Sequence, residues 1–143
     1  MTPQENKLLL EYLCMALPYG ICANLPNHHL VSHKYVIHDI NIQNGWTTGL
    51  LDCAGRIQIY SAKVEDIKPY LRPMSSMTEE EKVQLSQYAC IGEDMNGEFI
   101  DEVQRKDCAA YINWLLKNHL DFMGLLPKGL AIEVTKENNP YKQ

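Results

Sequence analysis

The sequence predicts an α+β domain, on three observations. Apolar residues recur at helical spacing near the start of the chain, side chains alternate with a period of two from Lys34 onward, and helical spacing returns after residue 102. At 143 residues the chain has the usual length of one domain. We expect residues 1–135 to form a single α+β domain with an N-terminal helix, an antiparallel β-meander of three to five strands and two further helices packed on one face. Residues 136–143 are polar and are predicted to form a frayed tail.

The first helix is predicted from its start signals. Thr2 is a favoured N-cap residue type, and Pro3 suits the first helical position because its missing N–H would have no partner there. Apolar residues at helical spacing extend the helix over about residues 3–16. Residues 18–20, Pro-Tyr-Gly, end it, and residues 21–25 are predicted to form a short strand.

The alternating segment predicts a three-stranded meander. Residues 34–43 alternate until Asn44-Gly45, a dipeptide that favours a type I′ hairpin turn because both turn residues must take positive φ. Residues 46–53 are then expected to return antiparallel. A second turn at Ala54-Gly55 leads to residues 56–60.

The two faces of this meander are expected to differ. One face is predicted to pack on helices, and the other to carry polar side chains toward solvent or a ligand. The side chains assigned to the second face are Asp39, Asn41, Gln43, Gln58 and Tyr60.

The middle of the chain combines prolines with a helix start. Pro69 and Pro73 exclude a long helix over residues 64–77, because each removes a backbone donor and restricts the residue before it. A rigid extended crossing is predicted there. Thr78 and Glu81 fit a capping box, which opens a helix to about Ala89.

The C-terminal third is predicted to hold the helix that organises the core. Apolar residues share one face over about residues 102–120, and the helix is expected to end near Gly124. Residues 92–97 before it are read as a loop with a hairpin turn at Asn96-Gly97, and residues 130–134 as a short strand that joins the meander.

Charge and composition exclude several partners and compartments. The net charge is −5, with 13 Lys and Arg against 18 Asp and Glu, so we expect neither nucleic acid nor a membrane as partner. The longest apolar runs are too short to span a bilayer. Five scattered cysteines without a C-x-x-C spacing indicate reduced thiols, and the first residues lack a secretion signal. These features predict a cytoplasmic protein.

Catalytic and metal-binding patterns are weak. His28, His29, His33 and His38 fall within eleven residues, but no Cys or H-E-x-x-H pattern joins them, and we interpret them as surface or core histidines. No base or helix N-terminus is recognisable beside any cysteine, and His119 is read as capping a helix. Phosphate-binding loops and the nucleophile elbow are missing. We therefore predict no metal, no cofactor and no enzymatic activity.

The proline-rich crossing is the candidate binding site. Lys68, Tyr70 and Arg72 place two cations and an aromatic ring on a stiff backbone. A guanidinium makes bidentate contacts with phosphate or carboxylate, and a tyrosine ring stacks on a base, so the combination suits a nucleotide-like anion. Tyr60 and Trp46 are the candidates for a second stacking surface.

A purely structural interpretation of the same segment stays open. In it the prolines form a corner, Tyr70 and Leu71 pack inward, and Arg72 pairs with a carboxylate.

Two segments carry a family resemblance. Residues 68–78, KPYLRPMSSMT, are similar to the signature K-P-x-L-R-P-[LM]-S-x-[LM]-T. Residues 119–132 are similar to a closing H-F-D-x-x-G-L-I-x-K-G-L-A-I, with Leu120 in place of the usual phenylalanine. With the leading helix that ends in Leu17-Pro18-Tyr19-Gly20, the chain resembles small proteins carried by phages and mobile elements of Bacteroides-type gut bacteria. The loop at residues 90–101 is not matched.

The resemblance implies where the protein comes from, and it does not imply a particular reaction. The family has no established reaction, but small phage accessory proteins often inhibit host defence stoichiometrically, and some are oligomeric sponges for cyclic-dinucleotide or ADP-ribose-type signals. The leading hypothesis is therefore a non-enzymatic phage accessory protein, in the cytoplasm of a bacterial host, that sequesters a small anionic ligand such as a cyclic nucleotide or an ADP-ribose derivative. Assembly into a homo-oligomer would complete its pocket. The alternative hypothesis is a protein–protein interaction module that inhibits a host or phage protein, and an enzyme using a cysteine or histidine is the least supported.

Overall fold

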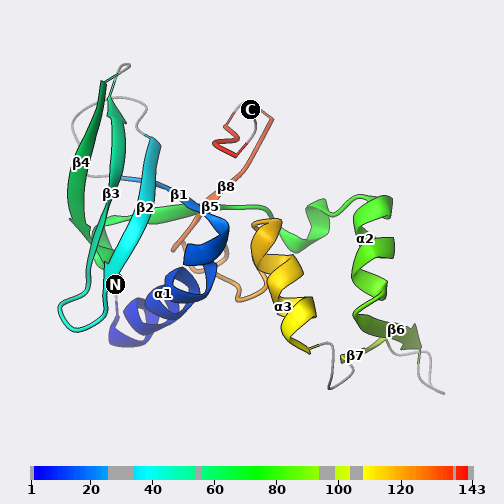
Figure 1. Ribbon diagram of the computed structural model, residues 1–143. Helices are drawn as coiled ribbons and strands as arrows, with labels where there is room; N and C mark the ends of the chain where they lie inside the picture. Colours follow the sequence, from blue (N-terminus) through cyan, green and yellow to red (C-terminus); the bar gives the residue numbers. More distant parts are fainter. Residues whose placement is uncertain are drawn as a thin grey trace.

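The predicted α+β class is confirmed by the computed structural model, which describes residues 2–25, 34–53, 56–93, 99–103, 108–136 and 138–141. A six-stranded sheet has the strand order β4-β3-β2-β1-β5-β8, and α1 lies across it (Figure 1). The strands of this sheet are β1 (Ile21–Asn24), β2 (Lys34–Asn41), β3 (Trp46–Cys53), β4 (Arg56–Lys63), β5 (Lys68–Leu71) and β8 (Ile132–Glu133). The α-helices are α1 (Pro3–Ala16), α2 (Glu79–Ser86) and α3 (Cys108–Lys117).

Shorter elements complete the described chain. Three single turns of 3-10 helix are η1 (Leu17–Tyr19), η2 (Val64–Asp66) and η3 (Met74–Ser76). The strands β6 (Ala89–Glu93) and β7 (Phe99–Val103) form a separate two-stranded ribbon. None of the helices in the described ranges combines the length and the apolar character that crossing a membrane would require.

The first helix has the predicted bounds and cap. The hydroxyl of Thr2 accepts a hydrogen bond from the backbone N–H of Glu5 at 3.1 Å. Leu9 and Leu13 are fully buried against the sheet, together with Tyr12 and Ala16. The helix is therefore held mainly by its apolar face, as expected of a helix that covers a sheet.

The meander is confirmed, but its first turn differs from the prediction. Strands β1 to β4 pair consecutively and antiparallel. The β2–β3 connection is a four-residue turn at residues 42–45, in which Gly45 has a positive φ of 71° and Asn44 does not. The side chain of Asn41 accepts hydrogen bonds from the backbone of Gln43 and Asn44, and this local bonding replaces the type I′ turn.

A β-bulge changes which residues of β2 face the core. Pairing passes from Ile37–Gly49 directly to Asp39–Thr48, so His38 is an extra residue. Gly49 is required beside the bulge, because a Cβ there would collide with the carbonyl oxygen of Val36. Beyond the bulge Ile40, and not Asp39, packs against the core.

The predicted faces of β4 are reversed. Tyr60 packs against the core and Ala62 is buried, so the isoleucines that alternate with them point away from α1. Ile57 is 68% exposed and Ile59 is 77% exposed. Gln58 is exposed, as predicted, but the solvent-facing assignment of Tyr60 was wrong, because the core selects its side of the strand.

The proline-rich crossing is extended, as predicted, and forms strand β5 inside the sheet. Its antiparallel pairing with β1 covers two residue pairs, Ala23–Pro69 and Asn24–Lys68. Cys22 and Tyr70 would form the next pair in this register. There the hydroxyl of Tyr141 accepts a hydrogen bond from Cys22 N at 3.2 Å and donates one to Tyr70 O at 2.9 Å. The tail that was expected to fray thus contributes a side chain to the sheet.

The predicted C-terminal strand joins the sheet at a different place. β8 pairs parallel with β5, so it lies at the sheet edge opposite β4 and does not extend the meander. The ring of Tyr141 stacks on His119, with ring centroids 3.5 Å apart.

The last helix is shorter than predicted at both ends. Strand β7 occupies the expected helix start, and α3 ends at Lys117 instead of near Gly124. His119 takes a left-handed conformation with φ 57°, while Leu120 N donates to Leu115 O as in a Schellman motif. The predicted hairpin turn at Asn96-Gly97 lies outside the described residues.

Helix α2 starts as predicted but packs elsewhere. Thr78 and Glu81 form both hydrogen bonds of the capping box. Leu85 of α2 packs with Leu115 and Leu120, so α2 lies against α3 and not directly on the sheet (Figure 1).

Candidate functional site

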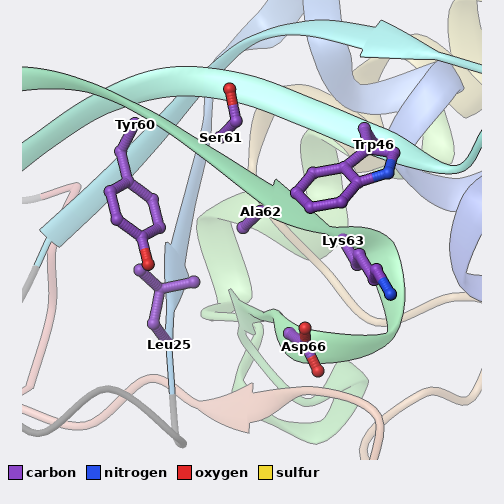
Figure 2. A pocket seen from close by; sticks show the side chains of 7 residues that line it. All are labelled: Leu25, Trp46, Tyr60, Ser61, Ala62, Lys63 and Asp66. Atoms are coloured by element: carbon purple, nitrogen blue, oxygen red, sulfur yellow. The ribbon is translucent and has the colours of Figure 1, made fainter.

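A pocket with a volume of about 260 Å³ lies where the end of β4 meets the start of β3 and the turn η2. Two of its lining residues, Trp46 and Tyr60, are those that the sequence predicted as stacking surfaces. Figure 2 shows the complete lining, which consists of Leu25, Trp46, Tyr60, Ser61, Ala62, Lys63 and Asp66.

The pocket reaches both faces of the sheet, because β4 is an edge strand. Neighbouring residues of a strand point to opposite faces, so Ser61 and Lys63 share the face of Trp46 while Tyr60 lies on the other. In Figure 2 Trp46 and Ser61 lie above the β4 ribbon, and Tyr60 points below it toward Leu25. A ligand at this site would contact the margin of the sheet from two sides.

The inner wall of the pocket is held rigidly by the core. The Tyr35 ring meets Tyr60 edge to face, with centroids 6.1 Å apart. The Tyr35 hydroxyl lies 2.9 Å from Thr47 Oγ1 and 3.2 Å from the carbonyl of Tyr60, and Thr47 donates to the carbonyl of Ala62. Burial raises the pKa of Tyr35, so this hydroxyl stays protonated and able to donate.

The outer wall combines an aromatic ring with a cation. Trp46 is 39% exposed, and the Lys63 ammonium lies 5.6 Å from the centre of its ring, within the range of a cation–π interaction. Asp66 adds an acceptor on the opposite side of the pocket. The arrangement suits a planar ligand that carries one anionic group together with hydrogen-bond donors.

Lys68 and Tyr70, two other predicted ligand residues, do not reach this pocket. Both lie on β5 and neither lines the pocket, although Lys68 follows Asp66 by two residues and pairs with Asn24, the neighbour of Leu25. They share one face of β5, because they alternate with the buried residues Pro69 and Leu71. Burial raises the pKa of Tyr70, whose carbonyl accepts from Tyr141.

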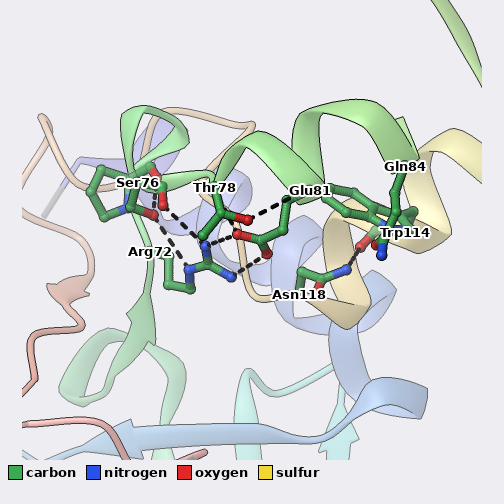
Figure 3. A network of polar contacts seen from close by, with 8 residues as sticks. Arg72, Ser76, Thr78, Glu81, Gln84, Trp114 and Asn118 are labelled. Carbon is green, nitrogen blue, oxygen red and sulfur yellow. Dashed lines mark hydrogen bonds and ion pairs between the residues drawn. The ribbon is translucent and has the colours of Figure 1, made fainter. Parts of the chain in front are cut away.

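Arg72, the residue expected to hold an anion, is paired with a carboxylate of its own chain. Its Nη1 and Nη2 donate to the two carboxylate oxygens of Glu81 at 2.8 and 2.7 Å. Its Nε donates to Ser76 Oγ, and Nη2 also donates to the carbonyl of Ser76 (Figure 3). The structural interpretation in which Arg72 pairs with a carboxylate is confirmed.

The partner of Arg72 is matched in charge as well as in geometry. The hydrogen bonds from Arg72 hold the pKa of Glu81 at about 2, with further donation from the Thr78 backbone. The pair links the end of β5 to the first turn of α2, where a carboxylate is also favoured by the helix dipole. An added phosphate at Arg72 would have to displace this carboxylate.

Lys63, Ser61 and Asp66 were missed by sequence reasoning. The predicted strand stopped at Tyr60, whereas β4 continues to Lys63. The alternation of Tyr60 and Ala62 with Ser61 and Lys63 was a usable signal, because it continues the period of two.

Of the four clustered histidines, His38 lies in the described part of the chain. His38 is exposed at the bulge of β2, and His28, His29 and His33 lie outside the described residues. Within the ranges that the structure describes, no three His, Cys, Asp or Glu side chains are grouped so that they could hold a metal ion.

Comparison with known proteins adds no relative. No protein-family model matches the chain, and neither a curated protein nor a solved structure matches it. The residues at the β4 margin are therefore the best guide to function.

Proposed function

We propose that this protein is a non-enzymatic binding protein that takes a small planar anion at the β4 margin. The observation that carries the proposal is that Trp46, Tyr60 and Lys63 line one pocket. A ring could stack on Trp46 while an anionic group meets the Lys63 ammonium. At its polar edge Ser61 would donate or accept a hydrogen bond and Asp66 would accept one.

The size of the pocket limits what one chain can enclose. Pockets for drug-sized ligands usually measure about 300–1,000 Å³, and this one is slightly smaller. It suits a mononucleotide or one half of a larger signal molecule. The resemblance to small phage proteins favours a nucleotide immune signal, such as a cyclic dinucleotide or an ADP-ribose derivative, held in the cytoplasm of a bacterial host.

Quenching of Trp46 fluorescence tests the proposal directly. The chain has two tryptophans, so a Trp114→Phe background leaves Trp46 as the sole reporter. Titration with AMP, a cyclic dinucleotide and ADP-ribose should quench this emission with at least one probe, and calorimetry should give the same affinity. Absence of both quenching and heat with all three probes would refute the proposal.

Two lysine variants locate the site. Lys63→Gln should weaken binding by roughly tenfold or more, because it removes a charge-assisted contact and keeps a polar, flexible side chain. Lys68→Gln is the comparison, since Lys68 lies on β5 and does not line the pocket. If Lys68→Gln weakens binding and Lys63→Gln does not, the ligand occupies the proline-rich crossing and not the β4 margin.

The exposed isoleucines of β4 favour a second candidate function, a protein–protein interaction module. Ile57 and Ile59 lie on an edge strand, and such strands accept a partner strand by β-augmentation. A stoichiometric partner protein should bind the wild type, fail to bind Ile59→Lys and still bind Lys63→Gln. Equal capture by wild type and Ile59→Lys would remove this candidate.

A further inference from the structure

The outer edge of β4 is long and apolar. β4 pairs with β3 through eight consecutive residue pairs, and no described strand pairs with its other side. Ile57 and Ile59 are 68% and 77% exposed, and Leu50, directly opposite Ile59 on β3, is 37% exposed. Three apolar side chains therefore form one patch beside a row of backbone groups that can pair with another strand.

The usual protections of an edge strand are missing from the centre of β4. Natural edges carry a central lysine, a proline, a bulge or a short strand, each of which blocks pairing with a second chain. In β4 the cations Arg56 and Lys63 lie only at the ends, and its register with β3 is uninterrupted. The bulge of this sheet lies instead in β2. The centre of the strand is thus open to pairing.

We propose that β4 pairs antiparallel with β4 of a second copy of this chain, about a two-fold axis at Gln58. In this register Ile57 of each copy lies opposite Ile59 of the other, which forms two isoleucine pairs on the outer face. Gln58 meets Gln58 on the inner face, and Arg56 lies opposite Tyr60 of the second copy. The two sheets become one continuous sheet, and the interface is self-complementary as a two-fold axis requires.

The charges of the strand agree with a second copy as the occupant. The chain carries a net charge of −5, yet β4 contains two cations and no carboxylate, so the strands meet where the repulsion between two acidic chains is weakest. The inference builds on the interaction-module candidate and does not depend on the small-ligand pocket.

The mass of the full-length protein in solution tests this pairing. Sedimentation velocity over a wide range of protein concentration should give a species of twice the 16.4 kDa of one chain. Ile59→Lys should weaken association roughly 100-fold, because the two-fold axis places the charge in the interface twice. Val83→Lys on α2 is the matched control, since Val83 is a 64% exposed apolar residue far along the chain from β4. It should leave the dimer intact.

A pair of complementary variants tests the identity of the partner and the register. A chain with Ile57→Glu and Ile59→Glu, and a chain with Ile57→Lys and Ile59→Lys, should each be monomeric, and their mixture should form a heterodimer. This result is expected only if β4 meets β4. Ile59→Thr, which keeps a strand-forming residue, replaces any charged variant that circular dichroism shows to be unfolded.

Several outcomes would overturn the proposal. A wild type that remains monomeric at every concentration excludes the second copy, even if a different protein is captured through β4. A wild-type dimer that survives Ile59→Lys and Ile59→Thr places the interface elsewhere. Loss of the dimer in Val83→Lys alone assigns it to α2.

Discussion

The two edges of the sheet are built in opposite ways. The β4 edge is eight residues long and exposes two isoleucines, whereas the β8 edge is two residues long and pairs parallel with β5. Beside β8 the hydroxyl of Tyr141 bridges the backbone of β1 and β5, where their ladder stops. The β8 end of the sheet is thus short and tied to the tail, and we call it the closed edge; the β4 end, the open edge, is long and pairs with a described strand on one side.

At the closed edge, side-chain contacts connect several elements of the fold. Around the β5 end, Arg72, Glu81, His119 and Tyr141 connect strand, helix and tail through hydrogen bonds and ring stacking. The open edge presents backbone groups and apolar side chains, and a partner that covered them would lower the free energy of the assembly. Variants at the closed edge should therefore alter folding, and variants at the open edge should alter association.

Tyr141→Ala should have the largest effect on folding. It removes the bridge between Cys22 and Tyr70 and the stacking on His119, and we expect a loss of about 3 kcal/mol in the free energy of unfolding. Tyr141→Phe, which keeps the ring, should lose about 1–2 kcal/mol. Urea denaturation measures both. Lys136→Ala, an exposed change in the same segment, is the control, and an equally small effect of all three changes would mean that the tail does not close the edge.

Arg72→Ala should cost about 2 kcal/mol, because it leaves the Glu81 carboxylate without its partner. The pKa of Glu81 is lowered to about 2 in the fold, against a reference value of 4.5. The ionised form is thus favoured by folding, so its contribution is complete above pH 4.5 and is lost as the pH falls toward 2. Denaturation of wild type and Arg72→Ala across this range should show a stability difference that shrinks at low pH. A difference that does not change with pH would contradict the ion pair.

His119 should add a separate pH dependence of about 1 kcal/mol. Burial lowers its pKa from 6.5 to about 4, and the nearby charge of Arg72 acts in the same direction. The unfolded chain therefore binds the proton more readily, and stability falls as the pH drops from 6.5 to 4. His119→Asn tolerates the positive φ and removes the titrating group, so its denaturation curve should be flatter across this window. An unchanged slope would assign the dependence to other groups.

The sequence predicted well the features that depend on local contacts. The bounds of α1, the capping box at Thr78 and the meander from Lys34 to β4 follow from caps, periodicity and turn residues. The exceptions depend on tertiary packing. The bulge at His38 changes the faces of β2, and the buried Ala62 selects which side of β4 is exposed.

The candidate site was predicted only in part, for the same reason. Trp46 and Tyr60 were chosen as aromatic surfaces and lie in one pocket. Lys68 lies on β5 and does not line that pocket, and Arg72 follows β5 and pairs with Glu81 of α2. Strand order and the path of a turn are set by long-range contacts, which periodicity does not reveal.

The smallest effect on the free energy of unfolding is expected from a substitution at the open edge. Ile59→Thr exchanges one strand-forming residue for another at a position that is 77% exposed, so the free energy of unfolding of the dilute monomer should change by less than about 0.5 kcal/mol. The same change should reduce association of the concentrated protein. Unfolding measured at low and at high protein concentration separates the two, because only the wild type should gain stability as the dimer forms. A large loss in the dilute monomer would show that Ile59 is covered within its own chain, and the β4 edge would then be closed like the β8 edge.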